Sequence, residues 1–149
     1  MLEIRKILVP VDFSDHSQRA LDEAIGLAKV FGSELHLLHC YQIHPTAIAP
    51  YGIVVPEAFE LDIRTAAAQR LSEWREKASA QGVRVQEHIT AHFPAEEIAA
   101  MADQLGIDLI VMGTRGLTGL KHVLLGSVAE RTIRLAKCPV LTVKHLTGS

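Results

Sequence analysis

Short apolar runs alternate along the chain with longer segments in which apolar residues recur every three or four positions. The short runs predict buried strands, and the longer segments predict helices that bury one face. Because strands and helices alternate throughout, we expect βαβ units, a parallel sheet and right-handed crossovers. The predicted strands cover residues 4–11, 34–41, 83–90, 107–112 and 139–144.

The predicted helices carry end signals. The first follows Ser14, a favourable N-cap, and the third begins with Pro94 in its first turn. Glycine, which is favoured just after a last helical turn, ends the first three helices at Gly32, Gly82 and Gly106. The residues predicted to face the core are Leu21, Ala24, Ile25, Ala28 and Phe31 in the first helix; Ile63, Ala67, Leu71, Trp74 and Ala78 in the second; Ile98, Met101, Ala102 and Leu105 in the third; and Val128, Ala129, Thr132, Ile133 and Ala136 in the fourth.

Residues 42–57 interrupt this alternation. They contain Pro45, Pro50 and Pro56, and therefore cannot form a regular helix or strand. Loops longer than about 12 residues in compact domains are often lids or binding loops. The length of this segment favours such a loop.

The segment 108–127, DLIVMGTRGLTGLKHVLLGS, contains four of the ten glycines. An apolar run is followed by Gly113, Gly116 and Gly119, and then by Gly126 and Ser127 at the start of the fourth helix. Glycine lets backbone N–H groups approach a ligand, and a helix N-terminus attracts anions. The segment therefore predicts a phosphate-binding site. The alternative is that the glycines only turn the chain between the strand and the helix.

The spacing of these glycines differs from the two commonest phosphate motifs. It does not fit G-x-G-x-x-G, and Ser127 follows Gly126 without the lysine of a P-loop. The pattern is G-x2-G-x9-G-S, which resembles the nucleotide signature of the universal stress protein family, in its ATP-binding branch. ILVPVDFSDHSQRAL near the start and GTRGLTGLKHVLLGSVAERTIRLAKCPVLTV at the end are similar to the opening and closing segments of that family.

The resemblance implies an α/β fold with a five-stranded parallel sheet in the order 3-2-1-4-5 and helices on both faces. Residues 1–149 would form a single nucleotide-binding domain. In such sheets ligands bind beyond the carboxyl ends of the strands, where the topology switches direction. If the first and fourth strands are neighbours, Asp12 and Gly113 face one crevice.

The resemblance also implies roles for individual residues. Asp12 would meet the ribose or adenine side of the nucleotide, and Cys40 would contact adenine. The family commonly has serine or histidine where this chain has Thr114 and Arg115. The residues expected to bind the nucleotide are Pro10, Val11, Asp12 and Cys40 on the nucleoside side, and Met112, Gly113, Arg115, Gly116, Gly126, Ser127 and Val128 around the phosphates.

Three of these residues have simpler alternatives. Asp12 could cap a turn together with Ser14, Cys40 could be a core residue, and Ser127 could be only an N-cap. Each alternative is compatible with the sequence pattern.

Composition limits the function classes. The chain has 149 residues, of which 48% are hydrophobic, and this indicates one ordinary domain with a real core. The net charge of -2 argues against a general nucleic-acid binder, although residues 113–137 carry a local +4 that suits a small polyanion. Two cysteines without a disulfide framework, and no signal peptide, favour a reducing compartment. No apolar run approaches the roughly 20 residues of a membrane span, so we expect a cytoplasmic protein.

The eight histidines could indicate a metal site. However, His36 and His39 should point to opposite faces of one strand, and the pattern around His88 and His92 does not favour a helix that would bring them together. We therefore expect no zinc site. No G-x-S-x-G motif is present, which argues against an α/β-hydrolase.

These observations favour an ATP-binding stress or signalling protein with slow or absent hydrolysis, in which Mg²⁺ accompanies the phosphates. The alternative is a slow ATPase or phosphotransferase, with Asp12 or a residue of the 42–57 loop as base. A third interpretation is a dimer scaffold that has lost the nucleotide. The resemblance implies a homodimer through the last strand, and the apolar residues of segment 139–146 agree with it.

Overall fold

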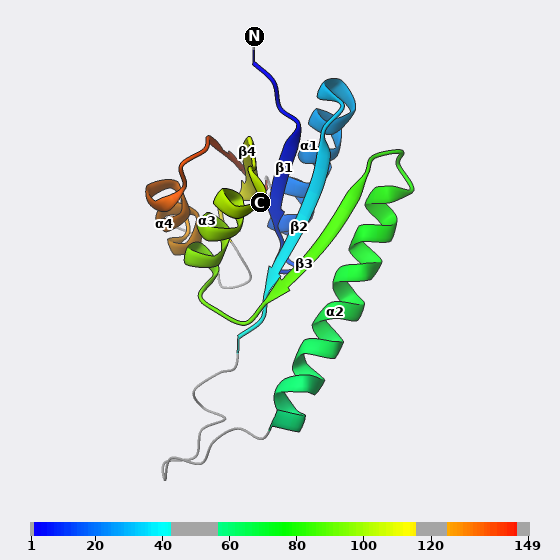
Figure 1. Ribbon diagram of the computed structural model, residues 1–149, viewed down its shortest axis with the longest axis vertical. Helices are drawn as coiled ribbons and strands as arrows, with labels where there is room; N and C mark the ends of the chain where they lie inside the picture. The colour runs from blue at the N-terminus through cyan, green and yellow to red at the C-terminus, as the bar shows by residue number, and fades with distance from the viewer. Residues whose placement is uncertain (1, 43–56, 116–124, 146–149) are drawn as a thin grey trace.

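The computed structural model describes residues 2–42, 57–115 and 125–145, which form a parallel sheet in the order β3-β2-β1-β4-β5 with helices on both sides (Figure 1). The predicted fold class and strand order are confirmed. The elements are β1 (Lys6–Pro10), α1 (Asp15–Phe31), β2 (Glu34–Cys40), α2 (Glu57–Ser79), β3 (Val85–Thr90), α3 (Pro94–Leu105), β4 (Leu109–Gly113), α4 (Ser127–Leu135) and β5 (Val140–Val143). The predicted 42–57 loop lies outside the described residues except at its two ends.

Most strands are shorter than the apolar runs that predicted them. Ile4 and Val11 lie outside β1, and Val83 and Ile107 precede β3 and β4, but all four side chains are buried. An apolar residue reports burial, whereas a strand is defined by its ladder of hydrogen bonds. The runs therefore predicted the core correctly and the strand ends less well.

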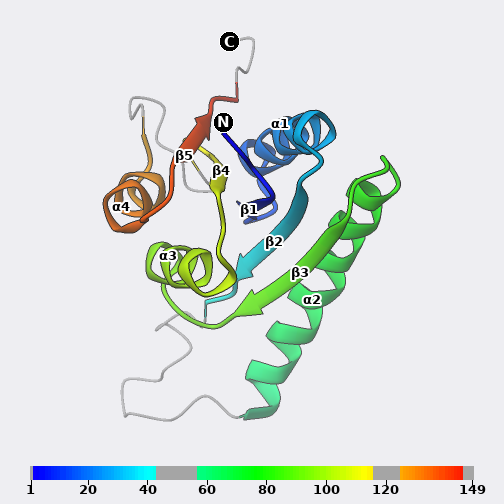
Figure 2. The same cartoon turned by 45° about the horizontal axis from the view of Figure 1, so that its top comes forward.

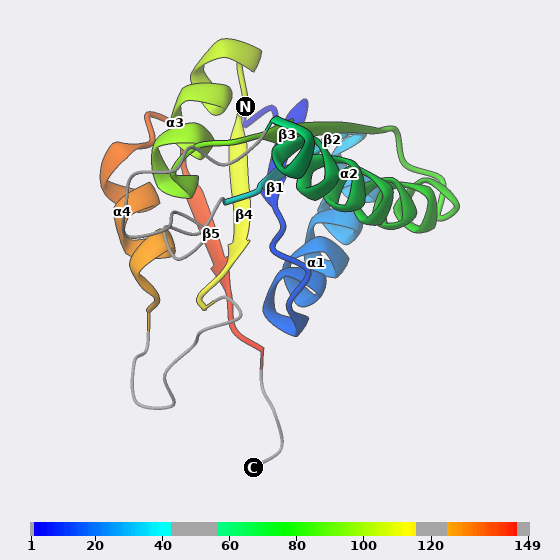
Figure 3. The same cartoon turned by 90° about the horizontal axis from the view of Figure 1, so that it is seen from below.

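The sheet separates two apolar clusters. Figure 3 shows α1 and α2 on one side of the strands and α3 and α4 on the other. On the α1 and α2 side, Ile7 and Val9 of β1 pack with Leu35 and Leu37 of β2. On the α3 and α4 side, the cluster contains Leu8 and Leu38, together with Ile98, Ile110, Met112 and Ala129. Because side chains alternate along a strand, each central strand contributes to both clusters.

The caps of α1 form as predicted. The Ser14 side chain accepts a hydrogen bond from the Ser17 N–H at 3.2 Å, and Gly32 takes a left-handed conformation with φ 70°. At α4 the prediction for Ser127 as a cap is wrong. Gly126 is the N-cap and Ser127 is the first helical residue, so its hydroxyl does not cap the helix.

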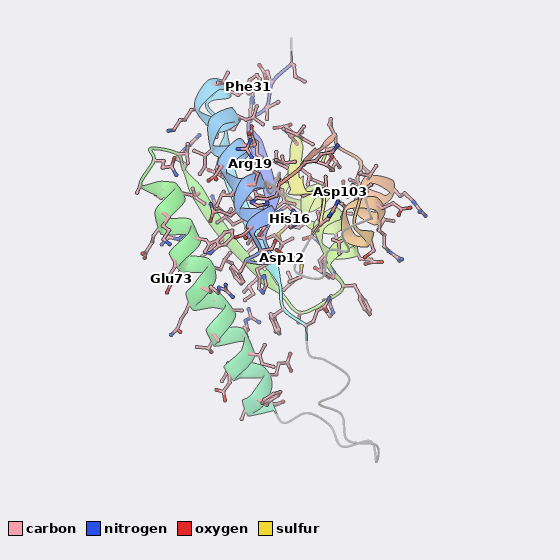
Figure 4. All side chains as sticks on the ribbon, turned by 180° about the vertical axis from the view of Figure 1, so that it is seen from behind. Asp12, His16, Arg19, Phe31, Glu73 and Asp103 are labelled. Atoms are coloured by element: carbon pink, nitrogen blue, oxygen red, sulfur yellow. The ribbon has the colours of Figure 1, made fainter. Side chains whose placement is uncertain are left out.

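Some residues predicted to face the core are exposed. Phe31 is the last residue of α1 and is 42% exposed. Figure 4 shows it at the end of the helix away from Asp12 and His16. In α4, Val128 and Ile133 are 38% and 45% exposed, whereas Ala129 and Thr132 are buried. Helix α2 lies along the edge strand β3, where less of the sheet is available to cover it (Figures 1 and 2). Of its predicted inward residues, only Leu71 and Ala78 are buried.

A histidine pair connects β2 and β3, which the sequence pattern did not reveal. His36 is 2% exposed, and its Nδ1 lies 2.9 Å from Nε2 of His88. Its Nε2 lies 2.7 Å from a carboxylate oxygen of Glu34. Burial lowers the pKa of both imidazoles from the ordinary value of 6.5, and Glu34 partly opposes that effect.

This pair predicts a specific dependence of stability on pH. Because the folded-state pKa values lie below 6.5, the unfolded chain takes up protons first as the pH falls. The contribution of the neutral histidine pair to the free energy of unfolding is complete above pH 6.5. It is lost as the pH falls through 6.5 towards the lower folded-state pKa values. We expect the double variant His36→Gln/His88→Gln to lose about half of the slope of unfolding free energy below pH 6.5, measured by urea denaturation.

The control is His92→Gln, which removes an exposed histidine. We expect this variant to keep the wild-type slope of unfolding free energy against pH. The slopes are compared rather than the absolute stabilities, since replacing a buried ring also changes packing. An unchanged slope in the double variant would contradict this interpretation.

Candidate functional site

A cavity of about 900 Å³ opens at the carboxyl ends of β1, β2 and β4. The chain leaves β1 towards α1 on one face of the sheet, and it leaves β4 towards α4 on the other. Two neighbouring strands whose connections diverge in this way leave a crevice between them. The volume is near the upper end of the range for small-molecule sites.

Ten of the eleven residues predicted from the sequence line this cavity, and the eleventh, Gly116, lies outside the described residues. Pro10, Val11 and Asp12 come from the end of β1 and the turn after it, and Cys40 ends β2. The others are Met112, Gly113 and Arg115 at the end of β4, and Gly126, Ser127 and Val128 at the start of α4. The structure thus brings together residues that are more than 100 positions apart.

Asp12 organises the turn between β1 and α1. Its carboxylate accepts hydrogen bonds from the Ser14 N–H at 3.0 Å and from the Ser14 hydroxyl. Its own N–H donates to the Ser17 hydroxyl at 3.3 Å. The turn-capping alternative is therefore correct as a description of the turn. It also holds the carboxylate in a defined position on the cavity wall.

Gly113 and Gly126, on either side of the glycine-rich segment, are closely packed against the chain. A Cβ on Gly113 would lie 3.0 Å from the backbone of His16, and one on Gly126 would lie 3.0 Å from the Thr114 carbonyl oxygen. Neither glycine has a positive φ. The described part of the loop is tied to the sheet by the Thr114 N–H, which donates to the Val143 carbonyl at 3.1 Å.

The basic residues of segment 113–137 divide into two groups. Arg131, Arg134 and Lys137 of the α4 region form ion pairs with Glu96, Glu130 and Asp103 respectively. Their side chains are exposed, so they belong to a solvated surface. Arg115 instead lines the cavity close to the first turn of α4, where unpaired backbone N–H groups favour an anion.

Cys40 is a core residue that also lies on the cavity wall. It packs against the apolar cluster on the α3 side and also lines the cavity. Burial raises the pKa of its thiol, which accepts a weak hydrogen bond from the Thr90 hydroxyl at 3.5 Å. A neutral thiol in this place offers a small apolar surface rather than a nucleophile.

The sequence did not reveal the contribution of α2 and of the residue that follows Asp12. Phe13 has φ 66°, and its ring lies 4.4 Å from His39 and 5.4 Å from Trp74 between centroids. The Arg70 guanidinium carbon lies 4.6 Å from the centre of the Phe13 ring. These contacts join segments far apart in the chain, and no local pattern marks them.

His39 connects this aromatic group to β1. Its Nδ1 lies 2.8 Å from the Val11 carbonyl oxygen, which can only accept, so Nδ1 carries the proton. Burial lowers the pKa of this imidazole, which is therefore neutral at pH 7. Within the described ranges, no three His, Cys, Asp or Glu side chains are grouped so as to hold a metal ion. None of the helices described could cross a membrane.

Comparisons with known proteins agree with this architecture. The profile of the Universal stress protein family matches residues 3–144. Universal stress protein YxiE of Bacillus subtilis is 41% identical over 145 residues, which cover 93% of this chain and 98% of the relative. Universal stress protein MJ0531 of Methanocaldococcus jannaschii is 38% identical over 94% of this chain and 82% of its own length.

Solved structures are also similar to this chain. The structure of hypothetical protein MJ0577 superposes with a TM-score of 0.85 at 30% identity, covering 99% of this chain and 100% of the other. A universal stress protein in complex with cAMP has a TM-score of 0.70 at 26% identity, covering 96% and 98% of the two chains. The fold and the cavity define a doubly wound α/β protein with a switch-point site. The chain belongs to the universal stress protein family.

The close packing at Gly126 predicts a stability effect. We expect Gly126→Ala to destabilise the protein by about 1–3 kcal/mol, because the new methyl group meets the Thr114 carbonyl oxygen. Gly26→Ala is the matched control, since Gly26 lies within α1 with nothing near its would-be Cβ. Alanine there should stabilise by roughly 0.5–1 kcal/mol. Urea denaturation measures both, and equal effects would contradict the packing interpretation.

Proposed function

We propose that this protein binds ATP with Mg²⁺ in the cavity and acts as a nucleotide-dependent stress or signalling protein. The observation that carries the proposal is the meeting of three groups in one cavity. These are the Asp12 carboxylate after β1, the Gly113–Arg115 end of β4, and the N-terminus of α4. Membership of the family supports the proposal, as does the related structure in complex with cAMP.

The chemistry of the walls suggests how the nucleotide lies. The adenine occupies the apolar side near Cys40, with Pro10 and Val11 shaping its edge, and the ribose hydroxyls donate to Asp12. The phosphates lie against Met112, Gly113 and Arg115, with Ser127 and Val128 presenting N–H groups of the first turn of α4 after Gly126. Gly116 is expected to complete this loop. Mg²⁺ would be held by phosphate oxygens and water rather than by a protein cage.

The same walls favour slow or absent hydrolysis. Asp12 is the one carboxylate among the described residues that line the cavity. It accepts hydrogen bonds from both the N–H and the hydroxyl of Ser14, so these interactions engage it in the turn rather than with a water poised for attack. We propose that nucleotide occupancy, rather than turnover, is the functional signal, in a cytoplasmic protein.

A homodimer through β5 forms part of the proposal. In the described sheet β5 is an edge strand, and Leu141 on it is 41% exposed. An apolar edge strand readily pairs with a second chain. Antiparallel pairing of two β5 strands would cover both edges.

The role of Asp12 predicts discrimination at the ribose. Wild-type protein should bind ATP about tenfold more tightly than 2′-deoxy-ATP, since the deoxy analogue lacks one of the hydroxyls proposed to donate to the carboxylate. Asp12→Asn keeps an oxygen that can accept from the Ser14 N–H but removes the charge. We expect the variant to lose most of the discrimination, measured by calorimetry with both nucleotides. Equal discrimination by variant and wild type would contradict the role of Asp12.

The proposed contact through β5 predicts that the wild type and a β5 variant differ in mass in solution. Light scattering at micromolar concentration should give twice the chain mass of 16.3 kDa for the wild type. Leu141→Lys should give a monomer, because it places a charge in the apolar strand contact. Leu61→Lys, at a position 63% exposed on α2, should remain dimeric. A monomeric wild type would refute the proposed dimer.

A further inference from the structure

The cavity extends to both faces of the sheet. Cys40 and Met112 on its wall belong to the apolar cluster of the α3 side. Val11 and Phe13 on its wall belong to the cluster of the α1 and α2 side. We call the second part the α2-side compartment, lined by Phe13, His39, Ile63, Ala66, Ala67 and Arg70.

Arg70 is the cation of this compartment. Eight ion pairs join described residues, and Arg70 takes part in none of them. Every Asp and Glu of the sequence lies within the described ranges, so this covers all side-chain carboxylates. A guanidinium stacked on an aromatic ring keeps N–H donors at its edge. Arg70 therefore offers hydrogen-bond donors and a charge that no carboxylate neutralises.

Phe13 places this cation next to the proposed ribose site. It follows Asp12 directly, and its left-handed backbone is held by its ring contacts with His39 and Trp74. Strained residues of this kind persist where the surroundings fix them, often at functional sites. Arg70 lies over the Phe13 ring, which also contacts His39, so the cation lies one residue along the chain from Asp12.

The ribose has two hydroxyl groups that can carry a phosphate. In dinucleotide sites, an acidic residue binds a free ribose hydroxyl, whereas sites for the phosphorylated ribose use a nearby arginine instead. Here both kinds of residue are present on adjoining parts of one wall. Asp12 is the sole acid among the described lining residues, so a ribose phosphate is favoured only where it lies towards Arg70, with the unesterified hydroxyl towards Asp12.

We propose that the α2-side compartment binds a phosphate esterified to the ribose, with Arg70 as its donor. The ligand class is therefore an adenine nucleotide that carries a second phosphate on the 2′ or 3′ oxygen. This rests on the proposed function, because it needs the ribose at Asp12. Arg70 is a specificity-determining residue in this arrangement.

The test compares three ligands that differ only at the ribose. AMP, adenosine 2′,5′-bisphosphate and adenosine 3′,5′-bisphosphate are titrated calorimetrically into the wild type, Arg70→Gln and Arg64→Gln. Arg64 is an exposed arginine of the same helix that does not line the cavity, so its variant controls for net charge. Arg70 is itself exposed, and water screens part of its charge, so the expected gain is moderate.

The wild type should bind one of the two bisphosphates about tenfold more tightly than AMP. Arg70→Gln should lose that preference while binding AMP as the wild type does, and Arg64→Gln should keep it. A wild type that binds both bisphosphates no better than AMP would overturn the inference and leave the proposed function intact. Equal losses in the two arginine variants would also overturn it, because they would indicate a general charge effect. Absence of binding by AMP and ATP alike would refute the proposed function together with the inference.

Discussion

The hydrogen-bonded pairing of β1 with β4 determines where the two main walls of the cavity meet. These strands are neighbours in space although α1, β2, α2, β3 and α3 separate them in the chain. Their pairing sets the Asp12 turn and residues Gly113 to Arg115 on one cavity. Without it, the carboxylate and the glycine-rich segment would have no common cavity.

Both ends of this pairing are secured by specific contacts. At the amino end, the Asp108 carboxylate accepts from the backbone N–H groups of Arg5 and Lys6 at 2.9 and 3.0 Å. The Lys6 ammonium group donates to the last residue of α3, the Leu105 carbonyl, at 2.9 Å. At the carboxyl end, Gly113 allows the backbone of His16 to approach β4. The first turn of α1 can therefore pack directly against the end of β4.

The features predicted correctly from the sequence are those with local signals. Ser14, Gly32 and Gly106 end or cap helices through contacts within a few residues, so their types are informative. The strand order was implied by the resemblance and not by the periodicity, because a right-handed crossover can reach either neighbouring position. Ten cavity-lining residues were implied by the resemblance rather than by the periodicity, and the lining residues of α2 were not predicted.

The remaining features depend on contacts between distant segments. The His36–His88 pair joins residues 52 positions apart, and Arg70 reaches Phe13 from a helix that follows the 42–57 segment. Phe31 and Ile133 occur at the helical spacing of core residues and were predicted to face the core, but both are exposed. Periodicity describes the face of a helix and does not reveal how far the neighbouring sheet extends beneath it.

The most direct test of the central claim is a calorimetric titration with ATP, after unfolding and refolding to remove nucleotide carried through purification. The wild type is compared with Cys40→Trp, which places a large ring in the cavity, and with Leu61→Trp, which places the same ring on an exposed position of α2. We predict micromolar binding by the wild type and by Leu61→Trp, and loss of binding by a folded Cys40→Trp variant. A folded wild type that does not bind ATP would contradict the claim that this cavity is a nucleotide site.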